Sequence, residues 1–234
     1  MKNRSIPLAL VVLSLATPLW AAPETIPQML IPQKDNFSRT NKQIRNSGAN
    51  ELLYLAPSKM VIAYIAFDLS SVSNKILHAE LRIHQASTQE PPLSFSVFPM
   101  ANTTNNANWG EGKGSLGAGG QNARIGESCY ARSAYRDIKW ESASGTPLLN
   151  LGTSRLWQPA VANLKEVEWK EEWISIPLSN EKLLEEIRTS KIPQITFGFW
   201  GSSGKGLYPI HSRESSFPPE LHLVLEKKPS PLKK

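Results

Sequence analysis

The stretch "HSRESSFPPELHLVLE", residues 211–226, ends in an alternating pattern that decides the fold class. Leu221, Leu223 and Leu225 occupy every second position, and a period of two places these side chains on one face of a β-strand. A charged turn precedes the strand and closes in two prolines, which lack N–H donors and therefore suit the start of a strand. The stretch predicts a core strand that the chain enters through a fixed turn.

The same alternation recurs along the chain. It is found in residues 51–57, 60–72, 76–87, 91–100, 171–178 and 194–202. Such alternation is typical of antiparallel strands with one face on the core and one face in water. Because strands do not alternate with helices, the sequence predicts an all-β fold, an antiparallel β-sandwich of jelly-roll or immunoglobulin-like type. No second apolar core is evident in the sequence, so we expect one domain.

Two segments depart from this alternation. Residues 179–191, "SNEKLLEEIRTSK", place Leu183, Leu184 and Ile187 at helical spacing and predict the one short helix. Residues 101–165 are rich in Asn, Gly and Ser, have no sustained period and predict a long irregular loop insert. The aromatic residues of this insert indicate that part of it packs.

The N-terminus has the layout of a secretory signal peptide. Lys2 and Arg4 precede an apolar run that is shorter than the about 20 residues a membrane span needs. We expect cleavage after Ala21 and a secreted protein, extracellular or periplasmic; an uncleaved anchor is the alternative. The expected layout is a signal peptide 1–21, an N-terminal extension 22–34, a sandwich 35–226 and a disordered basic tail 227–234.

Charge and cysteine content narrow the function classes. The formal net charge is +6, a weak field that does not predict a nucleic-acid partner but tolerates an acidic polysaccharide. Cys129 is the single cysteine, so an internal disulfide is excluded and the core must hold by burial. We expect Cys129 to be a small, partly buried side chain.

Several short motifs follow one another in a recognisable order. "DNF" at 35–37 precedes "FDLS" at 67–70, and the next strand carries Ala79, Leu81 and Ile83. "WGE" at 109–111 lies in the insert, and "SRE" at 212–214 comes before Pro219 and Leu221. In this order, from about residue 35 to residue 226, the chain resembles the DNRLRE domain, also called carbohydrate-binding module family 96.

The resemblance implies a β-sandwich that binds polysaccharide, with alginate as the ligand class. The long Gly- and Asn-rich insert departs from the family pattern and puts an inherited binding groove in doubt. The charged turn predicts a structural clamp on the last strand: Arg213 and Glu214 can form a bidentate pair, and Arg213 could equally pair with Asp68. A role of Arg213 in sugar binding is the alternative.

Exposed aromatic rings are the expected sugar-binding groups, because a flat ring can bind the C–H face of a pyranose. Trp109 and Trp140 lie in the insert. Trp169 and Trp173 share the odd positions of a segment whose even positions include Ile174, so both rings are expected to point away from the core. For each of these rings, packing between the insert and the sandwich is the alternative.

A basic cluster accompanies the aromatic residues of the insert. Arg124, Arg132 and Arg136 carry guanidinium groups, which bind carboxylates in a fork and suit a uronic-acid polymer. A solvated, charged loop is the ordinary alternative.

Metal and catalytic signals are weak. Oxygens that calcium accepts are found on Asp35, Asn36, Asp68 and Glu214, but no D-x-D-x-D-G loop is present, so structural turns are expected and calcium stays open. The sequence has no G-x-S-x-G, no H-E-x-x-H, no phosphate loop and no dinucleotide fingerprint. We expect no cofactor and no catalysis.

These observations predict a secreted, non-catalytic carbohydrate-binding module for a polysaccharide, which can be anionic and alginate-like. Two alternatives belong to other classes: an extracellular structural or adhesion module that binds protein, and a polysaccharide lyase or hydrolase. The sequence leaves the glycan and the oligomeric state open.

Overall fold

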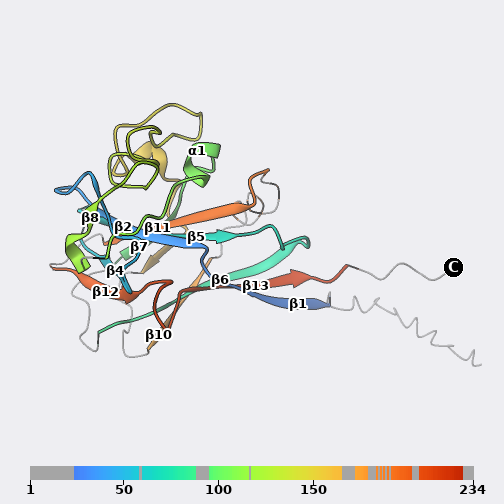
Figure 1. The fold of residues 1–234 in the computed structure, drawn as a ribbon. Helices are drawn as coiled ribbons and strands as arrows, with labels where there is room; N and C mark the ends of the chain where they lie inside the picture. Colours follow the sequence, from blue (N-terminus) through green and yellow to red (C-terminus); the bar gives the residue numbers. More distant parts are fainter. Residues whose placement is uncertain are drawn as a thin grey trace, which may run out of the picture.

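Two antiparallel sheets pack face to face in the computed structural model, which describes residues 24–57, 60–87, 95–115, 117–164, 172–178, 183, 185, 187, 189, 191–201 and 206–228. The first sheet has the strand order β1 (Thr25–Leu30), β13 (Glu220–Glu226), β6 (Ile76–His84) and β10 (Trp173–Pro177). The second has the order β2 (Lys34–Arg39), β5 (Val61–Asp68), β11 (Gln194–Gly201), β7 (Phe95–Pro99) and β9 (Ala162–Leu164). The expected antiparallel β-sandwich is confirmed (Figure 1).

Smaller elements join the ends of the sandwich. Two short ladders pair β12 (Tyr208–His211) with β4 (Leu52–Leu55), and β3 (Arg45–Asn46) with β8 (Gln121–Asn122). The insert contributes the helix α1 (Thr104–Ala107) and the 3₁₀ turns η1 (Gly117–Gly119) and η2 (Ser154–Leu156). Figure 1 shows the insert as coils stacked on the side of the second sheet that faces away from β6 and β13.

The main hydrophobic core lies between the two sheets. Phe67 and Phe197 from the second sheet meet Leu81 and Leu223 from the first in one buried cluster, and none of the four is more than 2% exposed. Fully burying a side chain of this size contributes about 1.5–3 kcal/mol. The alternation that identified these strands therefore corresponds to the inward face of each sheet.

A second hydrophobic cluster lies on the other face of the second sheet, where the sequence predicted water. Tyr64 on β5 and Trp200 on β11 pack against rings of the insert. The cluster contains Ile62, Ala66, Met100, Trp109, Tyr130, Trp140, Leu148, Leu151, Leu156 and Trp157 as well. The expectation of a single apolar core is wrong, because the insert covers β5 and β11 and buries both faces of these strands.

The ends of the sandwich differ from the expected boundaries. The segment expected as an extension, residues 22–34, supplies β1, which pairs with β13 from Thr25–Glu226 to Leu30–Leu221. At the other end, Lys227 continues this contact: its backbone N–H donates to Glu24 O, and its Nζ pairs with the Glu24 carboxylate. The expected signal peptide and residues 229–234 of the tail lie outside the described residues.

The predicted helix is confirmed at the positions that the structure describes. Residues 183, 185, 187 and 189 are helical, and Leu183 and Ile187 are buried in the main core. Within the described part of the chain, no helix has the length and apolar character needed to cross a bilayer.

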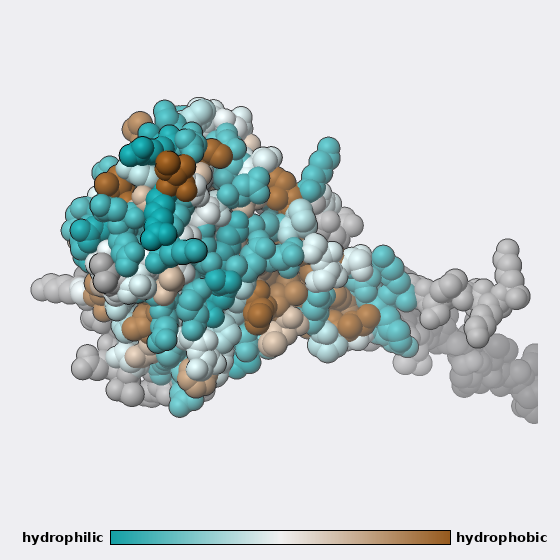
Figure 2. All heavy atoms as spheres, in the orientation of Figure 1, coloured by the Kyte–Doolittle hydropathy of each residue, from teal (hydrophilic) through white to brown (hydrophobic). Residues whose placement is uncertain are grey.

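Figure 2 shows one face of the molecule, on which hydrophobic residues form separate patches among hydrophilic ones.

Candidate functional site

The charged turn that precedes β13 belongs to a cluster of charged side chains from three separate parts of the chain. Arg213 Nη2 donates to Glu111 Oε2 over 2.6 Å and to Glu214 Oε1 over 2.7 Å. Asp35, at the start of β2, donates its backbone N–H to Glu111 Oε1 (2.6 Å), and its Oδ2 accepts the backbone N–H of Arg213 (2.6 Å). We call Asp35, Glu111, Arg213 and Glu214 the carboxylate cluster.

Close backbone packing holds Glu111 in this cluster. The Asn46 amide donates to Glu111 O (2.5 Å) and to Ser128 O (2.8 Å), and its Oδ1 accepts from the backbone N–H of Gly114 (3.2 Å). A Cβ on Gly114 would lie 1.9 Å from the carbonyl oxygen of Asn46, so only glycine permits this approach. The glycines of the insert thus bring the W-G-E motif against β3.

Burial shifts the pKa values of this cluster. Desolvation, with the neighbouring Glu214 charge as the next cause, raises the pKa of the fully buried Asp35 carboxyl well above its usual range. Desolvation raises the pKa of Glu111 to about 7 and lowers the pKa of Lys34 to about 8. Burial therefore opposes ionisation of the Asp35 and Glu111 carboxyl groups.

The predicted clamp is confirmed in one pair and wrong in the other. Arg213 and Glu214 form the ion pair described above, but through the single nitrogen Nη2 and not in the expected bidentate form. Asp68 takes no part in it: this side chain is exposed at the end of β5 and accepts from the backbone N–H of Ser70 (2.8 Å) and from Ser70 Oγ (3.0 Å). The second partner of Arg213 is Glu111, whose only sequence signal was its place in the W-G-E motif.

Trp109 and Trp140 are not exposed rings, so their prediction as sugar-stacking groups is wrong. Their side chains are 1% and 0% exposed, and both meet the ring of Tyr64 edge-on, at centroid distances of 4.9 and 5.9 Å. Trp109 Nε1 donates to Thr196 Oγ1, and Trp140 Nε1 to Cys129 O. The alternative, packing of the insert onto the sandwich, applies to both. Cys129 itself is buried.

The three predicted arginines of the insert lie on one of its loops. Paired backbone hydrogen bonds join Gly126 and Glu127 to Tyr135, with Arg124 before and Arg136 after this ladder. The side chains of Arg124 and Arg136 are exposed, whereas Arg132 is partly buried and donates from Nη1 to Ala131 O. These positions agree with the solvated loop that was the ordinary alternative.

Trp173 points away from the main core, as its odd position in the strand predicted. Ile174 and Ile176 of β10 are buried inward, while Trp173 is half-buried on the outer face of the first sheet. Its partner in the predicted platform, Trp169, lies outside the described residues. The strand register places Trp173 directly opposite His84 of β6, and this pairing determines what surrounds the indole.

Four rings gather at this end of the first sheet. The His84 imidazole lies edge-on to Trp173 (5.0 Å between centroids), stacks on Phe217 (4.4 Å, 12° between planes) and meets His211 at 4.9 Å. Phe217, from the turn before β13, is 45% exposed. We call Trp173, His84, His211 and Phe217 the ring cluster. No periodicity marks Phe217, so its position here could not be predicted from the sequence.

Hydrogen-bonding groups without partners lie inside the ring cluster and beside it. His84 is 6% exposed, and among the described residues neither of its ring nitrogens has a hydrogen-bond partner. The same holds for His211 Nδ1 and for Nε of Arg82, whose guanidinium lies over the Trp173 ring at 5.2 Å. Glu172 Oε2 lies 3.9 Å from His84 Nε2, beyond hydrogen-bonding distance. Buried polar atoms are normally paired, so these groups are unsatisfied.

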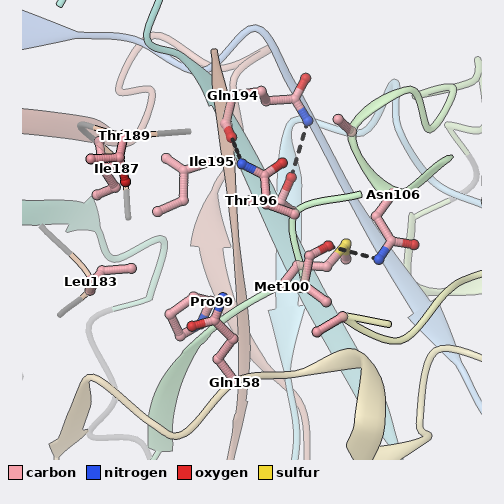
Figure 3. A pocket seen from close by; sticks show the side chains of 14 residues that line it. Pro99, Met100, Asn106, Gln158, Leu183, Ile187, Thr189, Gln194, Ile195 and Thr196 are labelled. Carbon is pink, nitrogen blue, oxygen red and sulfur yellow. Dashed lines mark hydrogen bonds between the residues drawn. The ribbon is translucent and has the colours of Figure 1, made fainter. Parts of the chain in front are cut away.

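A groove separates the helical segment at 183–189 from the insert. Its volume is about 290 Å³, and Figure 3 shows Leu183 and Ile187 on one side, Asn106 on the other and Thr196 of β11 between them. The amides that line it bond to the protein itself: Asn106 Nδ2 donates to Ala101 O and Glu141 O, and Gln194 Nε2 to Thr196 Oγ1. The groove therefore has less to offer a ligand than the ring cluster.

The chain was compared with protein-family models and with curated proteins. No protein-family model matches the chain, and no curated protein matches it. The resemblance to the DNRLRE domain thus stays an expectation from the motifs, and the function has to be inferred from the chemistry of the two clusters.

Proposed function

We propose that the protein is an exported, non-catalytic β-sandwich that binds a polysaccharide through the ring cluster on the outer face of its first sheet. The observation that carries the proposal is the combination of two accessible rings, Trp173 and Phe217, with the partly exposed guanidinium of Arg82, which lies over the Trp173 ring. A sugar needs both features, because its C–H face packs on flat rings while its hydroxyl groups form hydrogen bonds.

The strand arrangement supports binding of a polymer rather than of an isolated sugar. β10 is the edge strand of the first sheet, so Trp173 lies at a border that an extended chain can cross. The outer positions of β6 and β13 continue the surface with polar groups such as Glu80, Arg82 and Glu220. A polysaccharide lying across β10 and β6 would meet the indole first and these polar groups next.

The charge beside the indole favours an acidic polysaccharide. Arg82 is held only loosely by its neighbours, at 3.9 Å from Glu80 Oε1 and 3.7 Å from Glu220 Oε2. These distances are longer than those of a charge-assisted hydrogen bond, so the guanidinium keeps donors for another carboxylate. A uronic-acid polymer such as alginate supplies a carboxylate on every residue.

Retention on polysaccharide gels tests the proposal. The wild-type protein is expected to be retarded on alginate, and Trp173→Ala to lose most of this retention while its Tm stays close to that of the wild type. Tyr135→Ala is the matched control, because it removes a partly exposed ring from the insert. Equal retention of Trp173→Ala and wild type, or no retention of the wild type on any acidic or neutral glycan, would overturn the proposal.

Two further measurements separate the parts of the proposal. Arg82→Gln is expected to weaken retention on alginate more than on a neutral glycan, because only the former carries carboxylates, and Arg124→Gln on the insert should change neither. Absorbance of unsaturated sugar ends during incubation with alginate should stay flat. A rise would identify a lyase and contradict the non-catalytic assignment.

A further inference from the structure

One carboxylate oxygen of the carboxylate cluster lacks a hydrogen-bond partner among the described residues. Asp35 is fully buried, and its Oδ2 accepts the backbone N–H of Arg213, whereas its Oδ1 has no hydrogen-bond partner among the described residues. A buried carboxylate oxygen without a partner is costly, since it has lost its water and gained nothing in exchange.

The carboxylates of Glu111 and Glu214 lie close to that of Asp35. One oxygen each from Asp35, Glu111 and Glu214 can be chosen so that all three lie within 4.8 Å of one another. Oxygens bound to one calcium ion at 2.3–2.6 Å can be no farther apart than about twice that distance, roughly 5 Å. The three carboxylates therefore already have the spacing of ligands to a common cation.

No cation among the described residues completes the cluster. Arg213 Nη2 is engaged by Glu111 Oε2 and Glu214 Oε1 and leaves Asp35 Oδ1 without a donor. Lys34, the other nearby cation, donates its Nζ to the carbonyl oxygens of Ala107 (2.7 Å) and Trp109 (2.9 Å). The guanidinium contacts the carboxylates of Glu111 and Glu214, whereas that of Asp35 contacts only the backbone N–H of Arg213. When ionised, the three carboxylates carry more negative charge than this one guanidinium balances.

We propose that Asp35, Glu111 and Glu214 bind a calcium ion, with Asp35 Oδ1 as the ligand that the fold holds in place. The donor set consists of carboxylate oxygens, without imidazole or thiolate, and hard cations prefer such a set. Glu111 and Glu214 are partly exposed, so water can reach the ion and fill its remaining positions. Arg213 Nη2 binds Glu111 Oε2 and Glu214 Oε1 and so holds the two glutamate side chains beside Asp35.

Such an ion would join three segments that are distant in the sequence. Asp35 belongs to β2 of the second sheet, Glu111 to the insert, and Glu214 to the turn that leads into β13 of the first sheet. In the unfolded chain these carboxylates are far apart, so the ion binds the folded state selectively and stabilises it. The role is structural and independent of the ring cluster.

The test uses the full-length protein after treatment with a chelator. Calcium at about 100 times its Kd is expected to raise the Tm by roughly 5–10 °C. Asp35→Asn should abolish this rise: the amide oxygen can still accept the Arg213 N–H, but an NH₂ group replaces the unpartnered oxygen. Asp68→Asn is the matched control, because it makes the same change at an exposed carboxylate and should leave the calcium effect intact.

Terbium provides a second readout that does not depend on stability. Tb³⁺ takes the oxygen ligands of calcium, and Trp109, two residues from Glu111, should sensitise its luminescence in the wild type and in Asp68→Asn but not in Asp35→Asn. An absence of both the Tm rise and the luminescence would show that Asp35 holds a proton instead and would overturn the proposal. An unchanged calcium effect in Asp35→Asn would overturn it as well, because the ion would then bind elsewhere.

Discussion

Arg213 and Glu111 are 102 positions apart in the chain, and Nη2 of the first lies 2.6 Å from Oε2 of the second. This ion pair connects the turn before the last strand of the first sheet to an insert that packs on the second sheet. The stretch that identified the fold class therefore also holds the insert in place. The predicted pair with Glu214 is present, but the second partner of Arg213 comes from the insert and not from β5.

Removing the Arg213 side chain should destabilise the protein. Arg213→Ala leaves Glu111 and Glu214 without their shared donor, and an unsatisfied partly buried group of this kind costs about 1–3 kcal/mol. Urea unfolding should show a lower midpoint with an unchanged slope. Arg124→Ala, which removes an exposed guanidinium from the insert, should stay within about 0.5 kcal/mol of the wild type. Equal stability of the two variants would contradict a clamp at Arg213.

The insert should unfold together with the sandwich. Trp140 is fully buried in the second cluster, so Trp140→Ala should cost about 3–5 kcal/mol and lower the single unfolding transition. Leu149→Ala, nine residues away at a side chain that is 81% exposed, is the control and should have little effect. Two separate transitions in the wild type, only one of them sensitive to Trp140, would show instead that the insert is an independent unit.

The pattern in the sequence predicted those parts of the fold in which one face of a strand meets water. In β13 the leucines are buried and the positions between them are half-exposed, as a period of two requires. In β5 the alternation is lost, because all positions from Val61 to Phe67 are buried. Tyr64 is buried by rings of the insert, and a sequence without periodicity cannot show that it will fold back over a sheet.

The candidate sites were predictable only in part, for a similar reason. The outward direction of Trp173 followed from the strand period alone. Its neighbours His84 and Phe217 depend on strand register and on a turn, which period and composition leave undetermined. The carboxylate cluster combines motifs that the sequence had identified separately, and only the fold shows that Asp35, Glu111 and Glu214 lie together.

The ring cluster should make stability depend on pH through His211. Burial, followed by the nearby His84, lowers the pKa of His211 from its usual 6.5, and the Glu51 charge opposes this shift only in part. The folded protein then binds fewer protons than the unfolded chain just below pH 6.5. The stabilising contribution of the neutral ring is therefore present above pH 6.5 and is lost as the pH falls through and below that value.

The measurement compares two proteins rather than two pH values alone. Lowering the pH from about 7.5 to about 5.5 should reduce the Tm of the wild type more than the Tm of His211→Asn. The comparison removes the opposite contribution of Glu111, whose raised pKa favours the folded protein in acid and is common to both. Identical pH profiles of wild type and variant would exclude a half-buried neutral imidazole at position 211.

Close packing of the insert against β3 should make Gly114 intolerant of any side chain. A Cβ there would lie 1.9 Å from the carbonyl oxygen of Asn46, a backbone atom that cannot move aside without disturbing the Asn46 contact to Glu111. Gly114→Ala should therefore lower the Tm and weaken calcium-dependent stabilisation together.

Gly119→Ala is the matched control: its backbone is not left-handed, and the nearest atom to an added Cβ is 3.7 Å away at the end of the Lys42 side chain. Its Tm should stay at the wild-type value or rise slightly, because alanine restricts the unfolded chain. A Gly114→Ala protein as stable as Gly119→Ala would mean that the insert is less tightly joined to β3 than these contacts require.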